Sequence, residues 1–173
     1  AAKLHHRNIV TAFDAEQAGD SCLLVMEYVD GKTLADLIHS GPMPVHEACQ
    51  AIRDAACCLA AAHAAGLVHR DVKPHTLIQA SDGTVKVLDF GLAKQQDETQ
   101  ALTAPGVGLG TPRFMSPEQI RGIDVDHRSD IYSLGCTWYQ MLTGSPPFPT
   151  GSVTNKLYAH VSKPRPDPRD INR

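Results

Sequence analysis

Two aspartates, Asp71 and Asp89, flank a segment that is typical of a β-hairpin. Two short apolar runs, at 77–78 and 85–88, are joined by Ser-Asp-Gly-Thr, and an Asp-Gly pair between such runs predicts a tight antiparallel turn. Because antiparallel strands return the chain to the edge where it began, the hairpin would bring the two carboxylates together. The sequence therefore predicts one site that holds both aspartates.

The residue types around this predicted site suit phosphate chemistry. One carboxylate could accept a proton, and the other could hold a hard cation such as Mg²⁺, which prefers oxygen ligands. Arg70 and Lys73, next to Asp71 in the sequence, add positive charge that suits a phosphate group. The site thus combines a candidate general base, a candidate metal ligand and two candidate phosphate-binding cations.

Length, charge and composition exclude several other classes of protein. The 173 residues carry 16 basic and 19 acidic side chains, for a formal charge of −3, and the isoelectric point is about 6.3. A nucleic-acid-binding protein or a polybasic membrane anchor would need a much stronger positive field. The longest apolar run, 55–62, is far shorter than the roughly 18 residues that span a bilayer. We expect no nucleic acid partner, no membrane span within this segment, and five reduced, partly buried cysteines.

Hydrophobic periodicity and turn residues predict a mixed α+β chain. Apolar residues spaced three and four apart indicate helices, and β-branched runs between turn residues indicate strands. Residues 91–112 show no periodicity and are expected to form a long functional loop. The helix expected at 130–142 is mostly apolar and is therefore expected to be buried. The other expected elements are an N-terminal hairpin with strands at 8–16 and 22–29, and helices at 33–39, 45–65 and 153–161.

Several motifs occur in an order that identifies a family. They are LHHRNIV (4–10), VMEYVDGKTL (25–34), HRDVKP (69–74), DFG (89–91), GTPRFMSPEQ (110–119) and SDIYSLGCTWYQMLTGSPPF (129–148). Together they resemble the eukaryotic-type, or Hanks-type, protein kinases, and most closely the Ser/Thr kinases of bacteria. A lone short motif would carry little weight, but this ordered set covers nearly the whole chain. The resemblance implies a protein-kinase-like α+β fold with a mainly helical C-terminal lobe.

The resemblance also implies that the chain is one partial kinase domain. Residues 1–29 would be the end of the N-terminal lobe and the hinge, and residues 30–173 an incomplete C-terminal lobe with the activation segment at 89–118. The family's glycine-rich loop, its small-lobe lysine and its αC glutamate have no counterpart here, and GVGLG at 106–110 is not that loop. We therefore expect this segment to be inactive by itself.

The catalytic roles follow from the resemblance, residue by residue. Asp71 would orient the substrate hydroxyl and accept its proton, and Lys73 would neutralise charge on the transferring phosphoryl group. A lysine two residues after this aspartate is the Ser/Thr-kinase pattern, so protein Ser/Thr hydroxyls are the expected acceptors. Asp89 would bind the Mg²⁺ that bridges the phosphates of ATP.

The resemblance places the adenine of ATP against the hinge. Glu27, Tyr28 and Val29 would present backbone groups to the base, with Met26 bounding the pocket. Ile78, together with Leu77, would form the floor beneath the adenine, although both suit ordinary core packing as well.

Other motif positions imply regulation and substrate binding. Arg70 could pair with a phosphate on the activation segment, for which Thr103 is the preferred acceptor and Thr99 the second, and the phosphate could come from self-phosphorylation in trans. Thr111 resembles the threonine that shapes the protein-substrate site. Glu118 resembles a structural glutamate whose usual arginine partner has no counterpart here, and Asp130 a carboxylate that braces the catalytic loop.

One residue departs from the family pattern within the catalytic loop. Thr76 stands where the family has an asparagine that ligates a second Mg²⁺ and steadies the loop. A threonine hydroxyl can offer one oxygen to a metal but cannot ligate and donate with the same reach. We therefore expect weaker metal binding and a slower reaction.

Three readings of function compete. The first is an ATP-dependent protein Ser/Thr kinase, cytoplasmic in this segment, whose parent protein could be anchored in a membrane elsewhere. The second is a pseudokinase that acts as a scaffold, for which Thr76 is the one argument. The third is a small-molecule phosphotransferase, disfavoured by the protein-substrate motif GTPRFMSPEQ. Scattered histidines do not indicate a zinc site, and core packing is expected for Tyr28, Tyr132, Trp138 and Tyr139.

Overall fold

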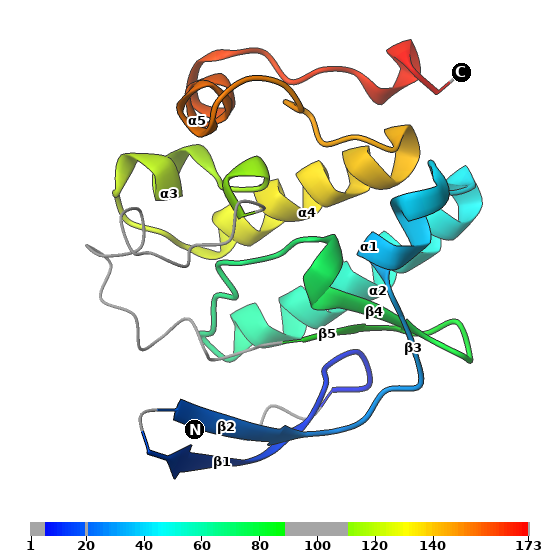
Figure 1. Ribbon diagram of the computed structural model, residues 1–173, viewed down its shortest axis with the longest axis vertical. Helices are drawn as coiled ribbons and strands as arrows, with labels where there is room; N and C mark the ends of the chain where they lie inside the picture. The colour runs from blue at the N-terminus through cyan, green and yellow to red at the C-terminus, as the bar shows by residue number, and fades with distance from the viewer. Residues whose placement is uncertain (1–5, 20, 89–110, 173) are drawn as a thin grey trace.

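The computed structural model describes residues 6–19, 21–88 and 111–172, which form two small antiparallel sheets and a mainly helical remainder (Figure 1). Figure 1 shows the sheets toward one end of the molecule and α5 at the other, with α4 between α2 and α5. The predicted α+β fold class is confirmed. The elements in chain order are β1 (Ala12–Ala18), β2 (Ser21–Met26), β3 (Gly31–Thr33), α1 (Leu34–Leu37), α2 (Val45–Ala64), β4 (Leu77–Ala80), β5 (Val85–Val87), α3 (Pro117–Arg121), α4 (His127–Thr143) and α5 (Val153–Ser162).

The N-terminal hairpin forms as predicted, but its first strand begins later. β1 and β2 pair antiparallel with Ala15 opposite Leu24. The backbone before β1 is engaged elsewhere, because Val10 N donates to Val87 O at 3.0 Å and Val87 N donates to Asn8 O at 2.8 Å. Residues 8–10 therefore hold β5 instead of extending β1, which a single stretch of sequence could not reveal.

The second sheet contains the predicted hairpin and one strand that the sequence did not indicate. β4 pairs with β5, and β3 adds to the other side of β4 in the order β3-β4-β5. At Gly31 in β3, a Cβ atom would lie only 2.2 Å from the Gln79 carbonyl oxygen. Gly31 therefore permits the close approach of β3 to β4 that no larger residue would allow.

The first two helices agree with the predicted ranges. Thr33 caps α1 through a capping box with Asp36, and a short 3-10 turn at Ile38–Ser40 completes the helical segment. α2 covers Val45–Ala64, and Gly66 follows with a φ of 73°. A left-handed residue just beyond the last turn is the usual way for a helix to end.

Of the last three helices, α5 agrees with its predicted range, whereas α4 and α3 differ from the prediction. α4 begins at His127, three residues earlier than expected, because the Asp126 side chain accepts from Arg128 N and caps the helix. α5 matches its expected range to within one residue. α3 was not predicted, although Ser116 and Gln119 form a capping box and Pro117 occupies its first turn. Five residues are too few to show a hydrophobic period.

The core lies between α2, α4 and the β4–β5 hairpin. Leu59 from α2, Leu77 from β4, Val87 from β5 and Met141 from α4 are all fully buried. The expectation of core packing is wrong for Tyr28, which is 87% exposed, and for Trp138, which is 40% exposed. Trp138 lies with Ile131 on an outer face of α4, so this helix is buried on part of its circumference only.

Of the four cysteines whose burial is described, two are buried and two are exposed. Cys58 and Cys136 are buried and Cys49 and Cys57 are exposed, and all four are free thiols. The expectation of partly buried cysteines is therefore wrong for the exposed pair. In the described ranges, no helix is both long enough and apolar enough to cross a membrane.

Asn8 offers a test of how the N-terminal segment is attached. Its side chain is buried and donates to Val85 O at 2.7 Å. Asn8→Ala leaves that carbonyl without its donor, so we expect the free energy of unfolding of the full-length protein to fall by about 1–3 kcal/mol, measured by urea denaturation. Asn155→Ala, at an exposed position on α5, is the control and should change it by less than about 0.5 kcal/mol. Equal effects of the two substitutions would contradict this account of the anchor.

Candidate active site

The segment 65–76 connects α2 to β4 (Figure 1), and His69–Thr76 form its second part. Arg70 has a φ of 67° and is the one non-glycine residue with a positive φ among those described. A side chain in this left-handed region costs free energy, so the conformation persists only where surrounding contacts impose it. The contacts around Arg70 therefore indicate which groups shape the loop.

The carboxylate of Asp130 on α4 supplies those contacts. Its two oxygens accept hydrogen bonds from the backbone N–H groups of His69 and Arg70, each at 2.8 Å. His63 on α2 lies 2.8 Å away through Nε2. Asp130 is buried, and three partners on two other segments compensate for the loss of water around it. The predicted brace of the catalytic loop is therefore present in the geometry.

Gln119 also contacts the turn at Arg70. Its side-chain amide donates to the Arg70 carbonyl at 2.7 Å, and its carboxamide oxygen accepts from Ser116 N at 3.0 Å. Gln119 was not predicted to have this role, although it ends the motif GTPRFMSPEQ. His63 was not predicted either, and no sequence signal indicates it, because its partner lies 67 residues away.

Asp71 and Lys73 lie side by side at the accessible end of this loop. Lys73 Nζ lies 2.6 Å from Asp71 Oδ2, and 41% of the Asp71 side chain is exposed. This carboxylate can therefore meet a substrate hydroxyl, with an ammonium group beside it. The arrangement suits proton acceptance next to a negatively charged group in transfer.

The His69 ring connects the catalytic loop to the far end of the hairpin. Its Nδ1 accepts from Asp71 N at 3.2 Å, and its Nε2 donates to Leu88 O at 2.7 Å. Leu88 N in turn donates to Thr76 O at 2.9 Å. The residue before Asp89 is thus held against the loop that carries Asp71. Asp89 itself lies outside the described residues, as do Thr99 and Thr103.

The Thr76 hydroxyl is engaged with the backbone of its own loop. It accepts from Lys73 N at 3.1 Å, and its hydrogen faces the carbonyls of Asp71 and Lys73 at 3.1 and 3.0 Å. The residue is buried. Thr76 therefore steadies the segment between Asp71 and β4, one of the two tasks that the resemblance assigns to an asparagine here.

The predicted hinge is tied to the second sheet through one ion pair. The Glu27 carboxylate accepts from Lys86 Nζ on β5 and from Thr11 N, and the hydrogen bond from Lys86 is the main cause that lowers the Glu27 pKa. Lys86 pairs across the sheet with Ile78 on β4. Glu27 and Ile78 are therefore both neighbours of Lys86, at the β4–β5 hairpin.

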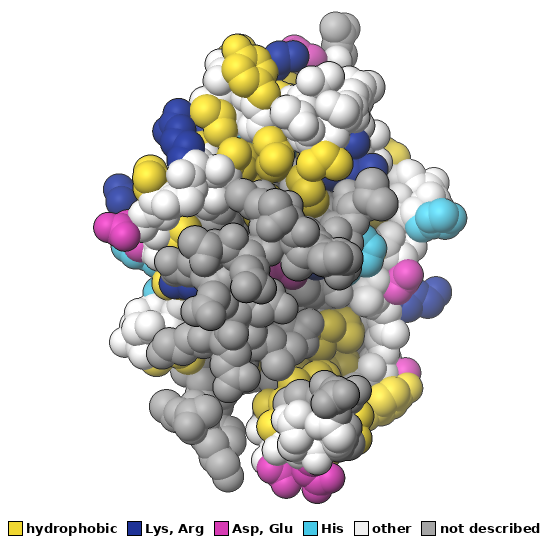
Figure 2. Space-filling view, turned by 60° about the vertical axis from the view of Figure 1, so that its left-hand side comes forward, with side chains coloured by type: hydrophobic (Ala, Val, Ile, Leu, Met, Phe, Trp, Pro, Cys, Tyr) yellow, Lys and Arg dark blue, Asp and Glu magenta, His cyan; other side chains and the backbone are white. Residues whose placement is uncertain are grey.

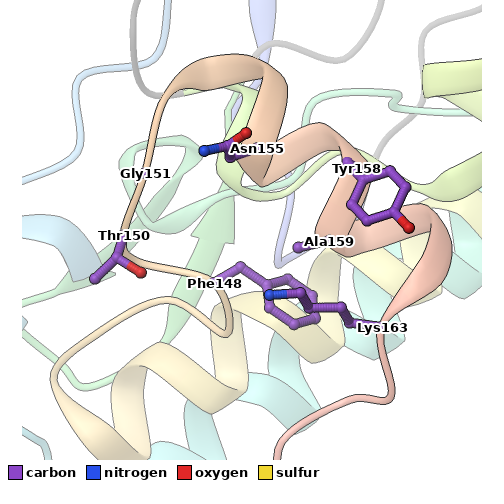
Figure 3. Close-up of a pocket in the computed structure, with 7 residues that line it drawn as sticks. All are labelled: Phe148, Thr150, Gly151, Asn155, Tyr158, Ala159 and Lys163. Atoms are coloured by element: carbon purple, nitrogen blue, oxygen red, sulfur yellow. The ribbon is translucent and has the colours of Figure 1, made fainter.

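The other residues that are predicted to contact adenine differ in how deeply they are buried. Met26, Val29 and Ile78 are half-buried, whereas the Tyr28 side chain points into solvent and Leu77 belongs to the core. A cavity of about 290 Å³ lies elsewhere, beside α5, where Phe148, Tyr158 and Lys163 help to line it (Figure 3). None of the predicted catalytic or adenine residues contributes to that cavity.

The predicted protein-substrate motif is anchored to α4. Ser133 Oγ donates to Phe114 O at 2.7 Å, and Ser129 Oγ donates to the Glu118 carboxylate. Burial opposes ionisation of Glu118, but hydrogen bonds led by that from Ser129 outweigh it and lower its pKa. Glu118 thus has a partner in Ser129, a residue that its motif does not indicate. The backbone of Thr111 starts a 3-10 turn that ends at Arg113, but its side chain is outside the described part.

Comparison with known proteins extends these observations. The chain is 44% identical over 173 residues to the Serine/threonine-protein kinase PknB of Mycobacterium leprae, in an alignment that covers 97% of this chain and 27% of that protein. It is 44% identical over 161 residues to the Serine/threonine-protein kinase PknL of Mycobacterium tuberculosis, covering 92% of this chain and 40% of that protein. The chain therefore spans well under half the length of these curated relatives.

A family model described as protein kinase domain matches residues 1–168. Because that match extends almost from end to end of the sequence, this chain belongs to the protein kinase domain family.

Proposed function

We propose that the full-length protein is an ATP-dependent protein Ser/Thr kinase, which transfers the γ-phosphate of ATP to Ser or Thr hydroxyls of proteins. One observation carries the proposal: the Asp71 carboxylate and the Lys73 ammonium lie 2.6 Å apart, accessible to a substrate, on a loop whose backbone is fixed by Asp130. The names of relatives such as PknB and PknL support the same activity.

In this proposal, Asp71 and Lys73 have different roles in the transfer of phosphate to the acceptor hydroxyl. Asp71 orients the hydroxyl and accepts its proton as the oxygen attacks the γ-phosphorus, and the bond from that phosphorus to the leaving ADP oxygen breaks. Lys73 lowers the cost of the negative charge that spreads over the phosphoryl oxygens. Because both side chains belong to one braced loop, little reorganisation is needed when the substrate arrives.

The described residues are compatible with ATP at the hinge. Within the part of the chain that the structure describes, the Glu27 carbonyl and the Val29 N–H have no hydrogen-bond partner, so they remain available to an adenine edge. Half-buried Ile78 would contact one face of the base, and half-buried Met26 would bound the pocket. The exposed Tyr28 would contribute through its backbone alone.

Mg²⁺ would be held chiefly by Asp89. The preceding residue, Leu88, is hydrogen-bonded to the catalytic loop through its carbonyl, to His69, and through its N–H, to Thr76. The ion would supply positive charge to the ATP phosphates. Thr76 is a second candidate ligand, but its hydroxyl already contacts three backbone groups. Its main task in this proposal is therefore to brace the loop.

The proposal also covers regulation and protein partners. A phosphate on Thr103, or second on Thr99, would pair with the Arg70 guanidinium, and self-phosphorylation in trans is the expected source. Protein substrates would bind along the motif that includes Thr111. The catalytic segment would work in the cytoplasm, where ATP is available, whether or not the full-length protein is anchored in a membrane.

Replacing the proposed base provides the first test. Asp71→Asn in the full-length protein should lower kcat for phosphate transfer to a protein by about 10²–10⁴-fold, because the amide cannot accept the proton. Transfer is measured with labelled ATP and casein. Asp124→Asn, at an exposed position, is the matched control and should leave kcat unchanged. Equal transfer by the wild type and Asp71→Asn would remove Asp71 as the base, and no transfer by the wild type would favour a pseudokinase scaffold.

Thr76 provides the second test. Thr76→Asn supplies a longer side chain with an oxygen for the metal, so we expect faster transfer, by about tenfold or more, and half-maximal activity at a lower Mg²⁺ concentration. Thr76→Val keeps the shape but removes the hydroxyl, and it should slow transfer because the loop loses its brace. If transfer and Mg²⁺ dependence are the same in the wild type and Thr76→Asn, the metal-binding argument is wrong.

Asp130 provides the third test. Asp130→Asn replaces an acceptor of backbone N–H groups with an amide whose NH₂ must face one of them. We expect a loss of about 2–4 kcal/mol in the free energy of unfolding, together with a lower kcat. His63→Gln, which can still donate to Asp130, should have a smaller effect on both. Wild-type kcat in a folded Asp130→Asn variant would show that the brace does not position Asp71.

A further inference from the structure

An ion pair between Glu27 and Lys86 joins the predicted hinge to the β4–β5 hairpin, and the function proposed above gives this pair no role. The Glu27 carboxylate accepts from Lys86 Nζ, and it also accepts from Thr11 N at 3.2 Å. The Glu27 side chain is 30% exposed and that of Lys86 is 20% exposed. Two charged groups that have lost most of their contact with water, beside a predicted binding site, need an explanation.

Lys86 approaches Glu27 from the face of the β4–β5 hairpin that is turned away from the core. Val85 and Val87, on either side of Lys86, are fully buried in the core where α2 packs against β5. Because successive side chains of a strand point to opposite faces, Lys86 lies on the other face. Ile78, the predicted floor beneath the adenine, is the cross-strand partner of Lys86 and lies on that same face. The ion pair therefore spans the space between this floor and the hinge.

The backbone of Thr11 holds Glu27 from a second side. Glu27 N donates to Thr11 O at 2.8 Å, next to the pair of Ala12 and Met26 that ends the β1–β2 hairpin. The segment before Thr11 is itself hydrogen-bonded to β5, at Val87. Both attachments of Glu27 thus lead to β5, one directly through Lys86 and one through residues 8–11. A shift of the hinge relative to β5 would stretch both.

We propose that Glu27 and Lys86 are positioning residues for ATP, whose ion pair holds the hinge in place relative to the face of the β4–β5 hairpin on which the adenine would lie. The inference rests on the proposed kinase function, which places the adenine between the hinge and Ile78. The Glu27 carbonyl and the Val29 N–H would bind the edge of the base, so a shift of Glu27 would misplace both groups. None of the described hydrogen bonds of the two side chains involves the loop His69–Thr76. The effect should therefore fall on ATP binding, with protein-substrate binding unaffected.

Other carboxylates near the hinge differ from Glu27. Figure 2 shows acidic side chains on the surface at the end of the molecule where β1 and β2 lie. Asp14 and Glu16 of β1 are exposed, and neither forms an ion pair with a residue that the structure describes. Exposed carboxylates of this kind contribute little to stability. Glu16 therefore provides a matched control for substitution of Glu27.

ATP binding by the full-length protein tests the proposal. Lys86→Met keeps an unbranched side chain but removes the charge, so the Kd for ATP, measured by calorimetry, should rise about 3–10-fold, while the KM for casein stays within about twofold. Lys86→Arg keeps the positive charge and should restore most of the loss. Lys163→Met, at an exposed lysine after α5, is the matched control and should leave the Kd unchanged. An unchanged or lower Kd in Lys86→Met, an equal rise in the Kd and the casein KM, or no rescue by Lys86→Arg would overturn the proposal.

A double-mutant cycle tests whether the two residues act as a pair. Glu27→Gln removes the other charge and should also raise the Kd for ATP about 3–10-fold, whereas Glu16→Gln should not change it. The double variant Glu27→Gln/Lys86→Met should bind ATP no more weakly than the weaker of the two single variants, because both substitutions remove the same interaction. If the two effects multiply, the residues act independently and the proposal is wrong.

Hydrogen–deuterium exchange without nucleotide supplies a readout that does not depend on activity. Amides at 26–30 should exchange faster in Lys86→Met than in the wild type and in Lys86→Arg, while those at 153–162 should not change. Identical exchange at 26–30 in the wild type and Lys86→Met would overturn the positioning role. A wild type that transfers no phosphate would instead contradict the proposed kinase function, and the exchange experiment would still decide the role of the ion pair.

Discussion

The geometry of the candidate active site depends on the hydrogen bonds accepted by the buried carboxylate of Asp130. This carboxylate accepts from two successive backbone N–H groups at His69 and Arg70, and so it holds a left-handed turn that an arginine does not favour. The turn directs Asp71 and Lys73 to the accessible end of the loop. A carboxylate can hold both backbone N–H groups because each of its two oxygens accepts a hydrogen bond. A side-chain amide has one oxygen, so its NH₂ group would face one of these N–H donors.

α4 combines three such anchors in its first two turns. Ser129 binds Glu118, Asp130 binds the catalytic loop, and Ser133 binds the Phe114 carbonyl. These side chains project from one helix, so helix geometry sets the spacing between their attachment points at Glu118, His69 and Phe114. The buried polar side chains of α4 therefore align parts of the candidate site that lie far apart in the sequence.

Features that depend on neighbouring residues could be predicted from the sequence, whereas features that depend on contacts between distant residues could not. The β4–β5 hairpin followed from an Asp-Gly turn between apolar runs, and the ranges of α2 and α5 followed from their spacing and end signals. β3 was missed because its pairing depends on Gly31 approaching Gln79, a contact between distant residues. Tyr28 was wrongly assigned to the core, because the hydrophobic character of a side chain does not tell which way the hinge directs it.

The sequence by itself determined the family and the order of its motifs, since residue types and spacing are written along the chain. It also determined which side chains could accept a proton or hold a phosphate. Only the tertiary structure decided that His63 and Gln119 support the catalytic turn and that Ser129 is the partner of Glu118. It also showed that the Thr76 hydroxyl braces its own loop. The contacts of His63 and Gln119 join residues 67 and 49 positions apart in the chain. Even the contacts between nearer residues exist only once the backbone has brought donor and acceptor within about 3 Å.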